Sequence, residues 1–167
     1  MKIKCAQQSF LKPGEFYFGD ASFCVHTLLG SCVAVTLWHP RLQIGGMCHY
    51  LLPTRPRNST HARGFYADDA IALFLENIHQ QKTSVHEYEA KVFGGAAVIA
   101  SNGKTGSFGE IGVQNIAAAM ALLKHHNFSV KASDVGGPHH RKLRMNLATG
   151  DVWVNGPGTE STRRAQR

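Results

Sequence analysis

A chain of 167 residues with 43% apolar side chains and 17 glycines is large enough to bury one core without disulfide or metal staples. Its formal net charge of +7 fits either a solvated basic tail that aids solubility or an acidic partner, whether nucleic acid, an anionic membrane surface or an acidic protein. The apolar stretches are too short to span a membrane, and the first residues lack the apolar run of a secretory signal. We therefore expect one cytoplasmic domain, residues 1–158, without membrane insertion.

The first half of the chain has the pattern of β-strands. Strands are expected over residues 23–28, 33–38 and 42–52, and the last two form an antiparallel hairpin that turns near Pro40 and Arg41. The next 13 residues, 53–65, are rich in turn-forming and basic residues and are long enough for a lid or a binding loop.

The second half begins with a helix from Asp68 to about Gln81, in which apolar residues recur at helical spacing and acids occupy the first turn. The later expected elements follow in chain order: a strand over 89–93, a glycine-rich turn over 94–97, a loop over 106–112, a helix over 112–126 with Val113, Ile116, Met120 and Leu123 on one face, and strands over 128–133, 143–147 and 152–154. This order predicts an α+β fold of mostly antiparallel sheet layers flanked by two main helices. Residues 159–167 are expected to form a disordered basic tail.

Four cysteines stand at positions 5, 24, 32 and 48. None belongs to a Cys-x-x-Cys pair, and the histidines lack the spacing of common structural zinc sites. We expect reduced thiols, no metal and no cofactor. Cys5, Cys24 and Cys48 are interpreted as buried structural residues.

Cys32 differs from the other cysteines because it follows the turn Gly30-Ser31, and His49 comes 17 positions later. A thiolate is the nucleophilic form of cysteine, and its free pKa of about 8.5 calls for a neighbouring base. In the predicted hairpin, positions 32 and 49 lie opposite each other at about 5 Å. Gly30 and Ser31 are candidate oxyanion residues, since glycine permits unusual backbone angles. The pattern predicts a thiol-dependent acyl transfer.

Further motifs surround this pair: Thr27-Leu28-Leu29-Gly30-Ser31-Cys32-Val33-Ala34-Val35, Ile44-Gly45-Gly46-Met47-Cys48-His49-Tyr50-Leu51-Leu52-Pro53, Tyr66-Ala67-Asp68, Lys91-Val92-Phe93-Gly94-Gly95-Ala96, Ile111-Gly112 with Asn115, and Asp134-Val135-Gly136-Gly137 with Arg141. Together they resemble the CheD family of chemoreceptor glutamine deamidases. The resemblance extends over roughly residues 12 to 155.

The resemblance implies a protein-glutamine glutaminase that hydrolyses selected glutamines of methyl-accepting chemotaxis receptors to glutamate and ammonia. It also implies a fold similar to the catalytic domain of glutamine-deamidating toxins, with Cys32 as nucleophile and His49 as the catalytic histidine. In some members a threonine lies six residues before the cysteine, where this chain has His26, while Thr27 lies five before. Thr27 is the predicted third catalytic residue and His26 is the alternative. The one-residue shift matters because neighbouring side chains on a strand point to opposite faces.

Other functions stay open at this point. The resemblance also allows a non-enzymatic chemotaxis adaptor that binds receptors or a phosphatase of the CheC type. A protease or transglutaminase could use the same Cys-His pair. A nucleic-acid-binding module is disfavoured, because the chain lacks both the aromatic and basic interleaving of an RNA-binding sheet and a helix-turn-helix pattern.

The basic surplus has a use in the deamidase hypothesis. Arg55, Arg57 and Arg63 follow His49 in the loop over 53–65. The glutamate-rich receptor helices implied by the resemblance would be attracted to them. These arginines are therefore candidate substrate-binding residues.

Overall fold

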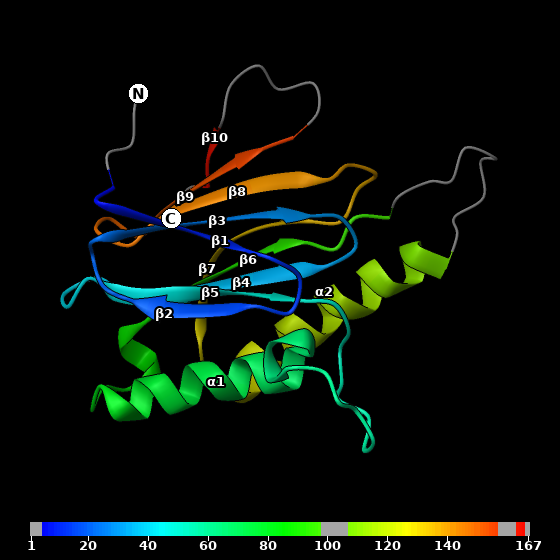
Figure 1. The fold of residues 1–167 in the computed structure, drawn as a ribbon, viewed down its shortest axis with the longest axis horizontal. Coiled ribbons are helices and arrows are strands. Elements are labelled where there is room, and N and C mark those ends of the chain that lie inside the picture. The colour runs from blue at the N-terminus through cyan, green and yellow to red at the C-terminus, as the bar shows by residue number, and fades with distance from the viewer. Residues whose placement is uncertain (1–4, 98–106, 157–162, 166–167) are drawn as a thin grey trace.

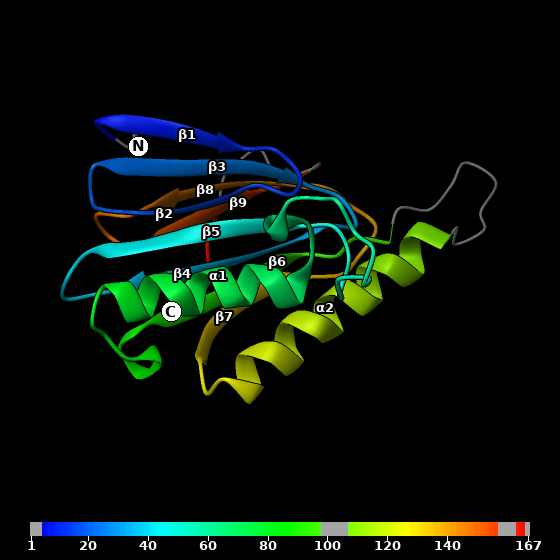
Figure 2. The same cartoon turned by 60° about the horizontal axis from the view of Figure 1, so that its bottom comes forward.

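Three layers form the described part of the chain: two stacked β-sheets, and two helices that cover the outer face of one sheet (Figure 1). The computed structural model describes residues 5–97, 107–156 and 163–165. Figure 2 shows both helices on the same side of the sandwich. The predicted α+β class with sheet layers and two main helices is confirmed.

Sheet A has the order β1 (Gln7–Leu11), β3 (Phe23–Leu29), β8 (Arg141–Asn146), β9 (Asp151–Asn155) and β10 (Arg163–Arg164). Sheet B has the order β2 (Phe16–Gly19), β5 (Ile44–Tyr50), β4 (Val33–His39), β6 (Glu89–Gly94) and β7 (Ser129–Val135). Among the pairs that the structure describes, β1 with β3 and β6 with β7 are parallel and the others are antiparallel.

Sheet B lies in the middle of the molecule because both of its faces are apolar. All seven residues of its central strand β4 are buried, as expected for an apolar, β-branched strand covered on both sides. Alternate residues of β4 enter two separate cores: Val33, Val35 and Leu37 pack under the helices, and Ala34 and Trp38 pack against sheet A.

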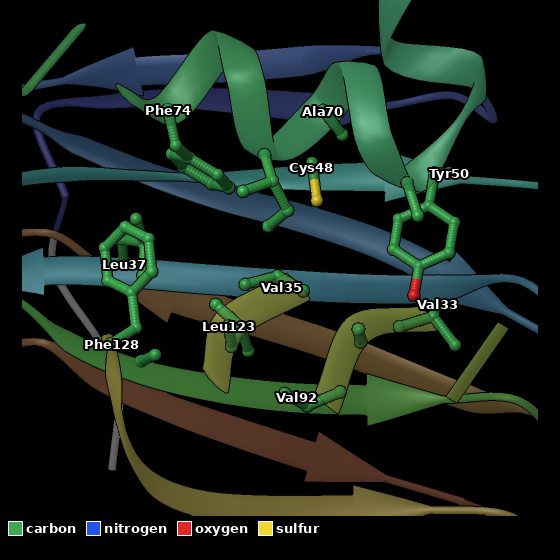
Figure 3. Packing of buried hydrophobic residues seen from close by; sticks show 14 of the residues in the cluster. Val33, Val35, Leu37, Cys48, Tyr50, Ala70, Phe74, Val92, Leu123 and Phe128 are labelled. Atoms are coloured by element: carbon green, nitrogen blue, oxygen red, sulfur yellow. The ribbon is translucent and has the colours of Figure 1, made fainter. Parts of the chain in front are cut away.

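The helix-side core is formed with α1 (Ala67–Gln80) and α2 (Ser107–His125). Ile71, Phe74 and Ile78 of α1 recur at helical spacing and are buried, as the sequence predicts. Figure 3 shows Cys48 and Tyr50 of β5 directed into this core, away from sheet A. Strand alternation therefore separates Cys48 from the face that carries His49.

The second helix corrects two predictions. It begins at Ser107, within the segment expected as a loop, and Val113, expected on one face with the apolar residues Ile116, Met120 and Leu123, is 63% exposed. The glycine at 112 made this segment resemble a loop. In the structure Gly112 lies inside the helix, where the lack of a side chain lets the backbone of the Gly94-to-Ala97 turn pass close by; a Cβ at this position would lie 2.6 Å from Gly95 O.

The C-terminal segment also differs from expectation. Arg163 and Arg164, assigned to a disordered tail, form β10 against Val154 and Trp153 of β9. The other tail residues, apart from Ala165, lie outside the described residues.

The cysteine prediction is wrong for Cys5 and Cys24, which form a disulfide. Strand β1, which the sequence did not reveal, runs parallel to β3 and places Gln7 opposite Phe23. The chain just before β1 is thereby brought beside β3, with 5.7 Å between the two cysteine Cα atoms. This separation lies within the usual range for a disulfide. Cys32 and Cys48 are free thiols.

The turn after β6 holds the segment between β3 and β4. Gly95 N–H donates to Cys32 O at 2.8 Å, and Ala96 N–H donates to Gly30 O at 2.8 Å. Gly94 has φ +103°, and a Cβ there would lie 2.3 Å from Cys32 O. The backbone around Cys32 is therefore fixed by a turn that only glycine forms without strain.

We expect Gly94→Ala to lower the free energy of unfolding by about 3 kcal/mol, because it adds both a strained φ and a clash with backbone. Gly137→Ala is the matched control: Gly137 has a similar positive φ of 72°, but a Cβ there meets nothing within 4 Å. This control is expected to cost about 1 kcal/mol. Equal losses in urea unfolding would contradict the close approach.

Candidate active site

The candidate site lies where the chain crosses from sheet A to sheet B. Strand β3 ends at Leu29, the crossing spans residues 30–32, and β4 begins at Val33. Thr27 of β3 and His49 of β5 are both buried and meet across the space between the sheets, where Thr27 Oγ1 lies 2.6 Å from His49 Nδ1. Half-buried Cys32 packs against the same inter-sheet core. The structure thus joins Thr27 to His49 directly and packs Cys32 against the core between their sheets.

The register of the hairpin differs from the prediction. His49 is opposite Ala34, not opposite Cys32, because the loop occupies residues 40–43 and the hairpin is centred one residue later than expected. Moving the centre by one residue changes the pairing by two, which keeps every side chain on its predicted face. Cys32 directly precedes Val33, the first paired residue of β4, and lies two positions before Ala34, the residue opposite His49.

The hydrogen bonds around Thr27 define the tautomer of His49. The Thr27 hydroxyl donates its single proton to Leu11 O at 2.8 Å, so it accepts the bond from His49 Nδ1. A neutral ring with its proton on Nδ1 has a lone pair on Nε2. His49 Nε2 is buried and has no hydrogen-bond partner among the described residues. This nitrogen is suited to accept a proton from a nearby thiol.

The electrostatic environment keeps both reactive groups neutral at pH 7. Burial lowers the pKa of His49 to about 4, although the Leu11 carbonyl and the Glu15 carboxylate oppose the shift. Burial raises the pKa of the Cys32 thiol, because the thiolate loses hydration. The resting pair is therefore a thiol and a neutral imidazole.

His26 does not reach this site. It lies opposite Arg144 in the pairing of β3 with β8, on the face of sheet A that points away from sheet B. Burial lowers the pKa of His26, and the charges of Arg144 and Lys142 lower it further. Of the two candidates for a third residue, Thr27 is the one whose side chain contacts His49.

The crossing residues are held through their carbonyl groups. Ala96 N–H binds Gly30 O, and the Asn115 side chain binds Ser31 O at 3.1 Å. Gly30 does not have a positive φ, and a Cβ there would meet nothing within 4 Å. Unusual backbone angles were the reason to single out Gly30, and the structure assigns that property to Gly94 and Gly95 instead.

Two of the three predicted substrate-binding arginines are engaged within the chain. Arg55 binds Asp69 at 2.8 Å and lies over the Tyr66 ring, and Arg63 forms a two-bond pair with Glu76. Arg57 is exposed. Arg55 and Arg63 therefore fasten the loop to α1.

The sequence does not reveal that Leu11 accepts the hydrogen bond from Thr27, because every residue type has the same backbone carbonyl. Sequence reasoning also did not give Asn115 a place in the site, although a polar residue within an apolar helix face was a visible signal. Asn115 is 0% exposed and contacts the crossing.

Other site types find little support in the described residues. No group of three or more His, Cys, Asp or Glu side chains there could hold a metal ion, and none of the helices is long and apolar enough to cross a membrane. A cavity of about 490 Å³ lies beside β7 and the C-terminal strands, lined by residues that include Ser133, Asp134 and Arg164. The Cys32, His49 and Thr27 side chains do not line it.

Comparison with known proteins gives consistent matches. A family model described as CheD chemotactic sensory transduction matches residues 51–156. Probable chemoreceptor glutamine deamidase CheD 3 of Dechloromonas aromatica is 44% identical over 89% of this chain and 86% of its own. The probable CheD deamidase of Pseudomonas syringae pv. tomato is 36% identical over 94% of each chain. A third, from Chromobacterium violaceum, is 38% identical over 87% of this chain and 75% of its own.

The low pKa of His49 predicts a pH dependence of stability. The unfolded histidine titrates near 6.5 and the folded one near 4, so the contribution of the neutral buried ring is complete above pH 6.5 and is lost as the pH falls towards 4. Over this window the loss amounts to about 3 kcal/mol. In His49→Asn, whose amide can still donate to Thr27, urea unfolding should show a shallower decline between pH 7 and pH 4 than in the wild type. Parallel declines would contradict the assignment.

Proposed function

Since this chain belongs to the CheD family, we propose that it is a chemoreceptor glutamine deamidase that converts selected glutamine side chains to glutamate and releases ammonia. The observation that supports this most directly is the buried ring of His49, whose Nδ1 is bound to Thr27 and whose Nε2 has no hydrogen-bond partner among the described residues. On the basis of the resemblance, we also propose that the protein is cytoplasmic and that it binds a phosphatase of the CheC type.

The first half of the reaction forms a thioester. The Cys32 thiol transfers its proton to His49 Nε2, and the thiolate attacks the carboxamide carbon of the substrate. Backbone N–H groups of the crossing, residues 30–32, are the proposed donors to the oxyanion. When the tetrahedral intermediate collapses, the C–N bond breaks and His49 gives its proton to the departing nitrogen, which leaves as ammonia.

The second half consumes one water. His49 is again neutral and removes a proton from the water that attacks the thioester carbonyl. The C–S bond breaks, glutamate is released, and the proton returns to the Cys32 sulfur. The bond from Nδ1 to Thr27 keeps the ring in one tautomer throughout, so that Nε2 performs each transfer.

Substrate recognition is proposed to use the loop over residues 53–65. Arg55 and Arg63 shape this loop through their pairs with Asp69 and Glu76. Exposed Arg57 would meet an acidic receptor segment directly.

We expect Cys32→Ala to abolish conversion of glutamine to glutamate in a receptor cytoplasmic fragment, because no other group in the site supplies the nucleophile. Mass spectrometry detects each conversion as an increase of about 1 Da in the modified peptide. Cys48→Ala is the matched control, since this second free thiol is buried on the helix side and is expected to retain turnover. Conversion by the Cys32→Ala protein at the wild-type rate would refute the proposed function.

The role of Thr27 is tested by removing its hydroxyl. Thr27→Val has nearly the same shape but leaves Nδ1 without its acceptor, so we expect kcat to fall about 100-fold with KM almost unchanged. Thr27→Ser keeps the hydroxyl and should retain most of the activity. His26→Gln, one position away on the opposite face, should change kcat by less than about twofold. A greater effect of His26→Gln than of Thr27→Val would reverse the assignment.

A further inference from the structure

Asn115 of α2 contacts both segments that carry the reactive pair. Its side-chain Nδ2 donates to Ser31 O at 3.1 Å and to Leu51 O at 2.8 Å. Ser31 directly precedes Cys32, and Leu51 follows His49 by two residues. One amide group therefore bridges the crossing and the end of β5.

The orientation of this amide follows from its two acceptors. Both are carbonyl oxygens, so the opposite orientation would place Oδ1 against two like dipoles. In the observed orientation Oδ1 is buried and has no hydrogen-bond partner among the described residues. An unpaired buried acceptor is costly to stability. This cost offsets part of what the two donated bonds contribute to stability at a position that is 0% exposed.

The backbone of α2 is fixed at the same place. Tyr50 Oη donates to Asn115 O at 2.5 Å, and Tyr50 directly follows His49. One turn earlier, Gly112 packs against Gly95 and Ala96, which hold the Cys32 segment through their N–H groups. The helix thus gives Asn115 a defined position relative to both strands.

We propose that Asn115 is a positioning residue that sets the separation and mutual orientation of the Cys32 thiol and the His49 imidazole. The reaction it serves rests on the proposed function, whereas the reactivity of the pair can be measured without any receptor. A displacement of about 1 Å between reacting groups can lower a rate by about 100-fold, so one bridging amide is enough to matter.

The first test measures alkylation of Cys32 by iodoacetamide between pH 5 and pH 9, followed by peptide mass spectrometry. Cys48 is buried and Cys5 and Cys24 are joined, so Cys32 is the accessible thiol. We expect the pH profile of Asn115→Ala to move from that of the wild type towards that of His49→Asn. Asn77→Ala is the control, because Asn77 of α1 also donates to a carbonyl, Leu73 O, but lies away from the site.

The second test uses Asn115→Asp. A protonated carboxyl can donate to one of the two carbonyl groups, while a carboxylate repels both, so alkylation and deamidation relative to the wild type should decline as the pH rises. A purely structural asparagine would not give this pH-dependent rescue. With the receptor fragment, Asn115→Ala should lower kcat by about 10-fold to 100-fold and leave KM within about threefold.

These measurements separate the two proposals. A folded Asn115→Ala protein with the wild-type alkylation profile and kcat would overturn the positioning role, as would a constant ratio of Asn115→Asp to wild type across the pH range. A lower melting temperature without a change in the profile would also assign Asn115 to structure alone. If the profile shifts but the wild type does not convert receptor glutamine, the positioning role stands and the proposed function fails.

Discussion

The hydrogen bond between Thr27 and His49 joins the two sheets at the point where the rest of the site is assembled. Each residue comes from the inner face of a different sheet, so the bond forms only when the sheets are stacked at the correct distance and register. Both side chains are almost fully buried, and a polar group at such a depth must find its partner. The sandwich core and the proposed chemistry therefore impose the same geometry.

Around this bond, the supporting contacts are made mainly by backbone. The glycine turn after β6 binds the carbonyl groups of Gly30 and Cys32, and Asn115 binds that of Ser31. Gly14 N–H and Glu15 O bind the backbone of His49. Such contacts fix the crossing without filling the space beside Cys32 with side chains. The cost is a set of positions where any side chain would collide with backbone, as at Gly94 and Gly112.

The sequence predicts which side chains of a strand share a face, because this depends on local periodicity. Strand alternation correctly placed Cys48 away from His49 and put His26 and Thr27 on opposite faces. It could not supply the hairpin register, which depends on how many residues the loop takes. The strands β1 and β10 are short or polar and obtain their order from neighbouring strands that are distant in the chain. The pairing of Cys5 with Cys24 was missed for the same reason, since it follows from the position of β1.

The position of β1 has a further chemical consequence. The carbonyl of Leu11, its last residue, accepts the hydrogen bond that the Thr27 hydroxyl donates. The Thr27 oxygen is then the acceptor in its bond to His49, so the ring proton lies on Nδ1. A chain shortened at its amino end would keep the cysteine, the histidine and the threonine, yet the threonine could then donate to Nδ1 and leave the proton on Nε2, the wrong nitrogen. The pairing of β1 with β3, which sets Leu11 opposite Thr27, therefore helps to decide which side of an imidazole ring is basic.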